Sequence, residues 1–166
     1  ISPGRFDQYM YPYYKSDMEA GNLTREFAQE LMDCIWVKLN DLNKCRDAAS
    51  AEGFAGYSLF QNLIVGGQNK YGEDVTNDLS FMCIEASTQV FLPQPSLSIR
   101  VWNGSPHELL IKAADLTRTG IGLPAYYNDE VIIPALQNRG LTLEDAREYN
   151  IIGCVERQKS LSLIHI

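Results

Sequence analysis

The chain has 166 residues, 45% of them hydrophobic and 21% charged, a composition typical of a globular domain with a real core. Its formal net charge is -7, so no basic surface is expected for the phosphates of nucleic acids. No apolar run approaches the roughly 20 residues that span a bilayer, and no signal-peptide pattern is visible.

The cysteine pattern argues against a metal centre. Cys34, Cys45, Cys83 and Cys154 are scattered along the chain and none forms a CxxC pair. We therefore expect no metal and no bound cofactor in this chain, and scattered thiols favour a reducing, cytoplasmic compartment. One disulfide pair is the alternative. Cys34 and Cys45 lie about three helical turns apart, so we expect both on one buried helix face.

Both ends of the chain look non-native. The sequence starts at Ile1 rather than at Met, and residues 161–166 look like the translation of a sequencing adapter. We therefore expect an internal fragment of a longer protein, with residues 1–158 native and residues 159–166 a non-native tail. A natural apolar tail is the alternative.

The first third of the chain predicts a loop, a helix and a strand. Residues 4–14 are rich in tyrosine without a clean period, which favours a loop of packed aromatics in which Arg5 pairs with Asp7 or a backbone carbonyl. A helix capped by Asn22 or Thr24 follows and runs to the break at residues 52–56. Its predicted apolar stripe comprises Phe27, Leu31, Ile35, Leu39 and Leu42. Residues 59–65 predict a buried strand.

The middle of the chain alternates helix and strand. Asn77 or Thr76 caps a helix that Pro93 ends, and residues 96–102 alternate as a strand does. Ser105 is the expected N-cap of a helix that ends at Gly120. His107 lies in the exposed first turn of that helix, and His165 lies in the tail. A catalytic triad built on histidine is therefore excluded.

The remaining elements are short. Residues 121–127 predict a strand or loop, residues 128–138 a helix interrupted by Pro134, and Thr142 begins one or two further helical turns. This alternation predicts an α/β fold with parallel strands joined by helical crossovers. The strands are too few to close a barrel.

Cys154 and Glu156 are the candidate catalytic pair. They follow a short apolar run and Gly153, a residue at which the backbone can turn tightly. In an extended segment, side chains two residues apart point to the same face, so the thiol and the carboxylate would share one space. The alternative is a buried packing cysteine followed by a surface carboxylate.

Five segments together resemble the glycyl radical enzymes of the pyruvate formate-lyase superfamily. They lie in the order expected for that family, from Gly4 to Glu156: residues 4–12, 60–67, 95–100, 122–130 and 153–156. The resemblance implies a partial, helix-rich piece of a ten-stranded α/β barrel, incomplete at both ends. It also implies that Cys154 is the site of a thiyl radical and that Glu156 is the base.

The letters around Cys154 favour one branch of that family. Pyruvate formate-lyases carry two adjacent cysteines in this loop, whereas Gly153 precedes Cys154 here. The loop looks like that of the eliminating enzymes, such as choline trimethylamine-lyase and glycerol dehydratase, and it also occurs in hydroxyarylacetate decarboxylases. Arg157 departs from the proline usual after the glutamate, which puts the shape of the loop in doubt. Phe60 matches a position that can hold a substrate-packing aromatic, with core packing as the alternative.

The resemblance implies further partners. It implies a small hydroxylated substrate, a homodimer of the full-length protein, and a radical on a glycine outside this chain. A separate radical SAM iron–sulfur activating enzyme would install that radical, and the fragment alone would be inactive. Acetyl transfer of the pyruvate formate-lyase type and a non-catalytic helical domain are the alternative functions.

Overall fold

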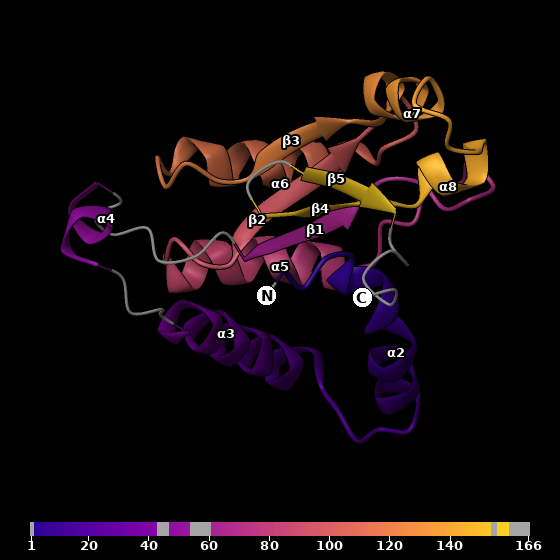
Figure 1. Ribbon diagram of the computed structural model, residues 1–166. Helices are drawn as coiled ribbons and strands as arrows, with labels where there is room; N and C mark the ends of the chain where they lie inside the picture. The colour runs from indigo at the N-terminus through magenta and orange to yellow at the C-terminus, as the bar shows by residue number, and fades with distance from the viewer. Residues whose placement is uncertain (1, 43–46, 54–60, 154–155, 160–166) are drawn as a thin grey trace.

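The computed structural model describes residues 2–42, 47–53, 61–153 and 156–159 (Figure 1). The helices are α1 (Phe6–Tyr9), α2 (Tyr11–Glu19), α3 (Arg25–Asp41), α4 (Ala48–Gly53), α5 (Asp78–Val90), α6 (His107–Arg118), α7 (Asp129–Gln137) and α8 (Leu143–Arg147). The strands are β1 (Asn62–Gly66), β2 (Ser96–Val101), β3 (Ala125–Asn128), β4 (Tyr149–Ile152) and β5 (Glu156–Lys159).

A parallel sheet in the order β1-β2-β3 forms the centre of the molecule. Helix α5 connects β1 to β2, and α6 connects β2 to β3. The predicted parallel strands with helical crossovers are therefore confirmed. Strands β4 and β5 form a separate antiparallel pair on the opposite side of the sheet from α5 and α6 (Figure 1).

The two faces of the sheet bury different clusters. Alternate side chains of a strand point to opposite faces, so Leu63 and Leu97 pack with the side chains of α3, α5 and α6. Ile64 points the other way and packs with Tyr149 and Ile151 of β4. Apolar contacts thus hold β4, the strand that precedes the candidate loop, on the face of the sheet opposite α5 and α6.

The N-terminal segment was wrongly predicted as a loop, because it forms the short helices α1 and α2. Neither helix has a side-chain cap, and no clean period marks them. Their apolar contacts to the rest of the molecule, through Phe6 and Tyr14, stabilise them instead. The predicted role of Arg5 is confirmed, since its Nη2 donates to the carbonyl of Gly66 at 3.5 Å.

Helix α3 corrects two further predictions. It begins after the predicted cap Thr24 but ends at Asp41, well before the predicted break. Its buried face contains Met32 and Trp36, whereas Phe27 and Leu31 of the predicted stripe are exposed. Cys34 is exposed rather than buried, because it lies on the solvent side of this helix; Cys45 lies outside the described residues.

The later elements follow the predictions closely. Asn77 and Thr142 cap α5 and α8, and His107 is exposed at the start of α6. Ser105 is not the cap of α6: its hydroxyl accepts from the backbone N–H of Trp102 at 3.0 Å, and Pro106 takes the cap position. Pro134 lies inside α7 without ending it.

Candidate functional site

Glu156 of the candidate pair begins β5, after the turn that follows β4. Ile152 and Glu156 are paired across the two strands, and Gly153 begins the turn with a φ of 62°. That left-handed backbone favours glycine, so the predicted turn at Gly153 is confirmed. Cys154 lies outside the described residues, and its geometry with Glu156 stays a prediction.

Glu156 opens β5 with its side chain exposed. Its carboxylate lies over Gly153, since a Cβ built on that glycine would be 2.5 Å from Glu156 Oε2. A glycine at this position therefore allows the carboxylate to fold back over the turn. The described residues do not bury Glu156, since β5 pairs only with β4 in the described sheets.

A buried ionic cluster holds β4 at the carboxyl ends of the sheet strands. Arg100 Nη2 contacts Asp129 Oδ2 at 2.7 Å, and Arg100 Nε donates to Asp129 Oδ1 at 2.9 Å. The Tyr149 hydroxyl donates to Asp129 Oδ1 at 2.8 Å, and the Arg100 guanidinium carbon lies 4.1 Å from the centre of the Tyr149 ring. Burial raises the pKa of Tyr149, so this phenol stays protonated and keeps donating.

A second polar group holds the start of the turn itself. Asn62 Nδ2 donates to the carbonyl of Gly153 at 3.5 Å, and the Ser98 hydroxyl donates to Asn62 Oδ1 at 2.8 Å. The backbone N–H of Gly153 donates to the Ser2 hydroxyl at 3.3 Å. Residues from the N-terminus, β1 and β2 thus converge on one glycine.

The N-terminal segment also lines the edge of β1. Gly4 exchanges backbone hydrogen bonds with Asn62 and Ile64 at 3.1 and 2.9 Å. Its φ is 69°, and a Cβ there would collide with the side chain of Asn150 on β4. A side chain at position 4 would therefore push β4 away from the sheet.

Two charged residues close to Gly4 have shifted pKa values: Asp7 is buried and Arg5 is partly buried. Asp7 Oδ2 accepts from the Ser80 hydroxyl at 2.6 Å and from the backbone N–H of Gly66 at 2.8 Å. Burial nevertheless raises the pKa of Asp7 above its usual value of 3.8. Burial, together with the nearby charge of Arg100, lowers the pKa of Arg5 to about 10.

Sequence reasoning missed the residues that hold the loop in place. Asn62, Ser98, Arg100, Asp129 and Tyr149 were not among the predicted site residues, although all are buried. One signal was present: Ser98 and Arg100 alternate with Leu97 and Ile99 in a strand otherwise expected to be buried. The predicted substrate contact Phe60 lies outside the described residues.

The described residues offer no group of three acidic, histidine or cysteine side chains that could hold a metal ion. Within the same residues, no helix is long and apolar enough to cross a membrane.

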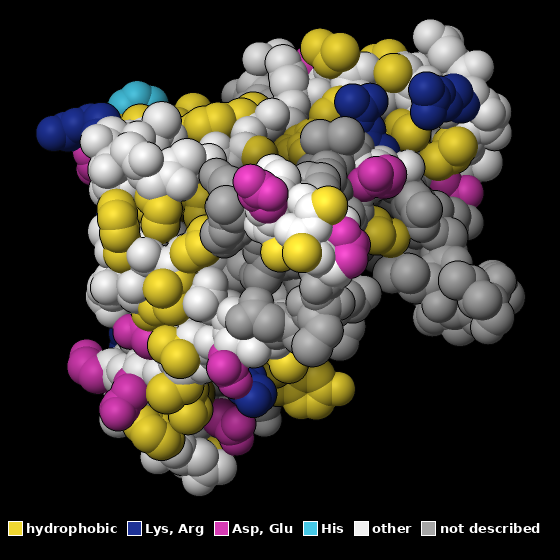
Figure 2. Space-filling view, turned by 60° about the vertical axis from the view of Figure 1, so that its left-hand side comes forward, with side chains coloured by type: hydrophobic (Ala, Val, Ile, Leu, Met, Phe, Trp, Pro, Cys, Tyr) yellow, Lys and Arg dark blue, Asp and Glu magenta, His cyan; other side chains and the backbone are white. Residues whose placement is uncertain are grey.

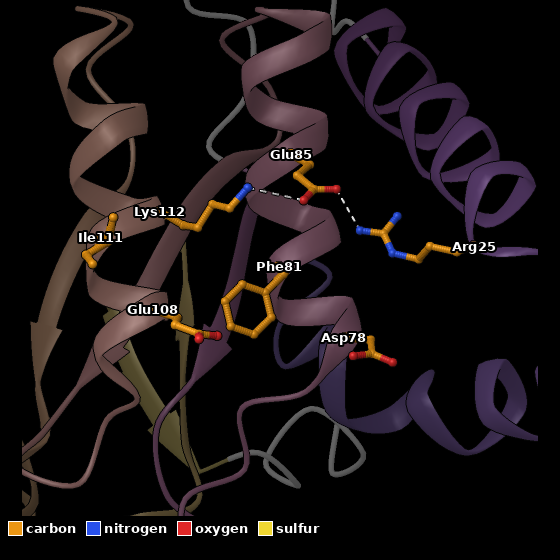
Figure 3. A pocket seen from close by; sticks show the side chains of 7 residues that line it. All are labelled: Arg25, Asp78, Phe81, Glu85, Glu108, Ile111 and Lys112. Carbon is orange, nitrogen blue, oxygen red and sulfur yellow. Dashed lines mark hydrogen bonds and ion pairs between the residues drawn. The ribbon is translucent and has the colours of Figure 1, made fainter.

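A surface pocket between α3, α5 and α6 lies on the helical side of the sheet (Figure 3). Glu85 of α5 lies between the other two helices, with its carboxylate 2.6 Å from Arg25 Nη2 of α3 and 3.5 Å from Lys112 Nζ of α6 (Figure 3). These two ion pairs therefore connect α3, α5 and α6. The opposite face of the sheet carries the β4–β5 turn, so this pocket is separate from the candidate site.

Comparison with known proteins gives a consistent match. The sequence profile of the pyruvate formate lyase-like family matches residues 1–162. (2S)-3-Sulfopropanediol dehydratase of Klebsiella oxytoca is 37% identical over 161 residues, which cover 94% of this chain and 19% of the relative. The chain therefore spans about a fifth of the length of such relatives.

Two solved structures are more similar in sequence. A Roseburia inulinivorans structure, described for 1,2-propanediol dehydration, is 79% identical with a TM-score of 0.92, covering 96% of this chain and 19% of that one. The glycerol-bound, B12-independent glycerol dehydratase of Clostridium butyricum is 67% identical with a TM-score of 0.89, covering 96% and 20%.

Proposed function

The chain belongs to the pyruvate formate lyase-like family, and from that premise we propose that the full-length protein is a glycyl radical dehydratase of a small vicinal diol. We propose 1,2-propanediol as the preferred substrate and glycerol as the alternative substrate. The fold prediction is confirmed, because the matching structures are barrel domains of glycyl radical enzymes of which this chain is a partial α/β piece.

One observation carries the choice of substrate. Identity is 79% to the structure described for 1,2-propanediol dehydration and 67% to glycerol dehydratase, but 37% to the sulfopropanediol enzyme. Over its length, the chain is therefore more similar in sequence to these two diol dehydratases than to the enzyme of a sulfonated diol. The choline lyase branch named by the sequence resemblance is not specifically supported.

The proposed chemistry uses Cys154 and Glu156 as the catalytic residues. The Cys154 thiyl takes a hydrogen atom from C1 of the diol, forming an S–H bond and a carbon radical. Glu156 accepts the proton of the C1 hydroxyl, the C2–O bond breaks, and the departing hydroxide takes that proton and leaves as water. The radical now at C2 takes a hydrogen atom back from Cys154, which yields the aldehyde and restores the thiyl.

Glu156 must be covered to serve as that base. Its carboxylate is exposed among the described residues, whereas a base that works near neutral pH has a raised pKa. We expect other segments of the full-length protein to bury it. Phe60 would pack against the carbon chain of the substrate.

The proposal includes partners. A radical on a glycine outside this chain supplies the oxidising equivalent to Cys154, and a radical SAM iron–sulfur enzyme installs it. The full-length protein would be a cytoplasmic homodimer, and residues 1–158 would be the native part of its barrel domain.

Two other functions are less well supported. Acetyl transfer of the pyruvate formate-lyase type uses a second cysteine beside the first, and Gly153 occupies that position here. Formate release from pyruvate would favour it. The other alternative is a non-catalytic helical domain. Absence of a glycyl radical after treatment with the activating enzyme would favour it.

The test uses the full-length protein, activated without oxygen and supplied with 1,2-propanediol. We expect the wild type to release propionaldehyde. The Cys154→Ala variant should lose turnover and keep the glycyl radical signal in electron paramagnetic resonance, because the radical resides on another segment. Cys34→Ala, which removes an exposed thiol from α3, should retain full turnover. Turnover by Cys154→Ala would refute the proposal.

A further inference from the structure

We propose that Asn62 is a positioning residue for the Cys154 thiol, acting through the backbone of Gly153 with Ser98 as its support; this inference rests on the proposed function. Asn62 is 1% exposed and Ser98 is 0% exposed, so both act inside the protein rather than at its surface.

The carbonyl that Asn62 contacts belongs to the peptide bond between Gly153 and Cys154. A peptide group is planar, so a hydrogen bond to the Gly153 carbonyl oxygen restrains the plane in which the chain leaves Gly153. The 3.5 Å distance from Asn62 Nδ2 to this oxygen marks a directed contact rather than a short bond. We infer that this contact orients the peptide group that links Gly153 to the next residue.

Ser98 determines which way the Asn62 amide points. The carbonyl of Gly153 only accepts, so Asn62 must present its NH2 group there. Its oxygen then faces Ser98, whose hydroxyl donates to it at 2.8 Å. Reversing the amide would place two oxygens against each other at Gly153, and the pair therefore has one arrangement.

The other peptide group of Gly153 is held as well. Its N–H donates to the Ser2 hydroxyl, which also accepts from the backbone N–H of Asn62 at 3.4 Å. Gly153 has the freest backbone in the loop, and both of its peptide groups are fixed by contacts to the N-terminal segment and β1. The start of the turn is thus held in one orientation that the local sequence alone does not impose.

The neighbouring residue provides a matched control. Gln61 is also 1% exposed, and its Nε2 donates to the carbonyl of Leu39 at 2.7 Å, away from β4. Gln61→Ala removes a buried amide of the same kind without touching Gly153. It separates a loss of stability from a loss of position.

The test compares Asn62→Ala, Ser98→Ala and Gln61→Ala with the wild type in the activated full-length protein and 1,2-propanediol. Glycyl radical content is measured by electron paramagnetic resonance, and kcat is expressed per radical. A displaced thiyl slows hydrogen abstraction without weakening substrate binding, so we expect Asn62→Ala to lower kcat about 10- to 100-fold with KM within about twofold.

The two other variants complete the prediction. Ser98→Ala leaves Asn62 in place but unsupported, and its kcat should fall about 3- to 10-fold. Gln61→Ala should lower the Tm and keep the wild-type kcat per radical. If Asn62→Ala accumulates no glycyl radical, Ser98→Ala tests the positioning role instead: its kcat per radical should fall while its KM stays unchanged.

The failures are distinguishable. If the wild type is active and Asn62→Ala keeps its kcat per radical, the positioning role alone is overturned. The same holds if kcat per radical falls equally in Gln61→Ala and Asn62→Ala. A wild type that carries no radical and does not turn over the diol overturns the proposed function, and the positioning role with it.

Discussion

At the scale of single residues, burial changes the pKa of Asp7, which could not be predicted from the sequence. It is fully buried beside Arg5, yet Oδ1 has no hydrogen-bond partner among the described residues, while Oδ2 accepts two hydrogen bonds. Desolvation outweighs these bonds and raises the pKa of Asp7. The charged carboxylate is therefore a cost to the fold near neutral pH.

The Asp7→Asn variant should change how stability depends on pH. A raised pKa means that the folded state binds more protons than the unfolded state in the interval above 3.8, so stability falls as pH rises through that interval. Asparagine can accept the same two bonds without a charge. We expect the variant to lose this fall, so its advantage over the wild type should appear near pH 7 and vanish near pH 4.

Urea unfolding of both proteins at several pH values measures this difference. Asp115→Asn, which removes an exposed carboxylate from a surface ion pair, controls for the loss of one charge. A difference between Asp7→Asn and the wild type that stays constant from pH 4 to pH 7 would rule out the proposed cause.

At the scale of elements, one ion pair joins three of them. Arg100 comes from β2, Asp129 opens α7, and Tyr149 starts β4. All three side chains are buried, so the charges depend on each other rather than on water. The cluster fixes how β4, and with it the candidate turn, sits on the sheet.

Asp129→Ala should lower the free energy of unfolding by about 3–5 kcal/mol, because it leaves the Arg100 cation buried and uncompensated. Asp115→Ala, in the exposed pair with Arg118, should cost less than about 1 kcal/mol. Adding Arg100→Met to Asp129→Ala should recover part of the loss. Urea denaturation gives the three values, and equal losses at Asp129 and Asp115 would contradict the role of burial.

At the scale of the whole molecule, helix α3 exposes apolar side chains at the surface. Phe27 and Val37 on α3 are 50% and 52% exposed, and acidic and hydrophobic side chains are intermingled on this side of the molecule (Figure 2). Exposed apolar patches favour association, so we expect this chain to self-associate.

Replacing both Phe27 and Val37 by lysine should raise the monomer fraction measured by sedimentation velocity. Each side chain is half exposed, so the free energy of unfolding should change by no more than about 0.5 kcal/mol per site. Gln89→Lys adds one positive charge, half of what the double variant adds, at an exposed polar site of α5 and should leave the monomer fraction nearly unchanged. An equal gain from Gln89→Lys would assign the effect to net charge alone.

The sequence by itself determined what depends on neighbours in the chain. The caps Thr24, Asn77 and Thr142, the alternation of β2 and the turn at Gly153 all follow from local hydrogen bonds and side-chain periods. The parallel order followed as well, because helices between short buried strands leave few other arrangements. Motif resemblance added the family and the expected roles of the candidate pair.

Only the tertiary structure decided what depends on segments far apart. Which face of α3 is buried was settled by Trp36, whose Nε1 donates to Ser87 on α5 at 2.9 Å, rather than by the predicted stripe. The helices α1 and α2 form because they pack, and the supports of Gly153 come from positions 91 and 151 residues away. Such contacts carry no local period, and so the residues that orient the candidate turn became visible only in the folded chain.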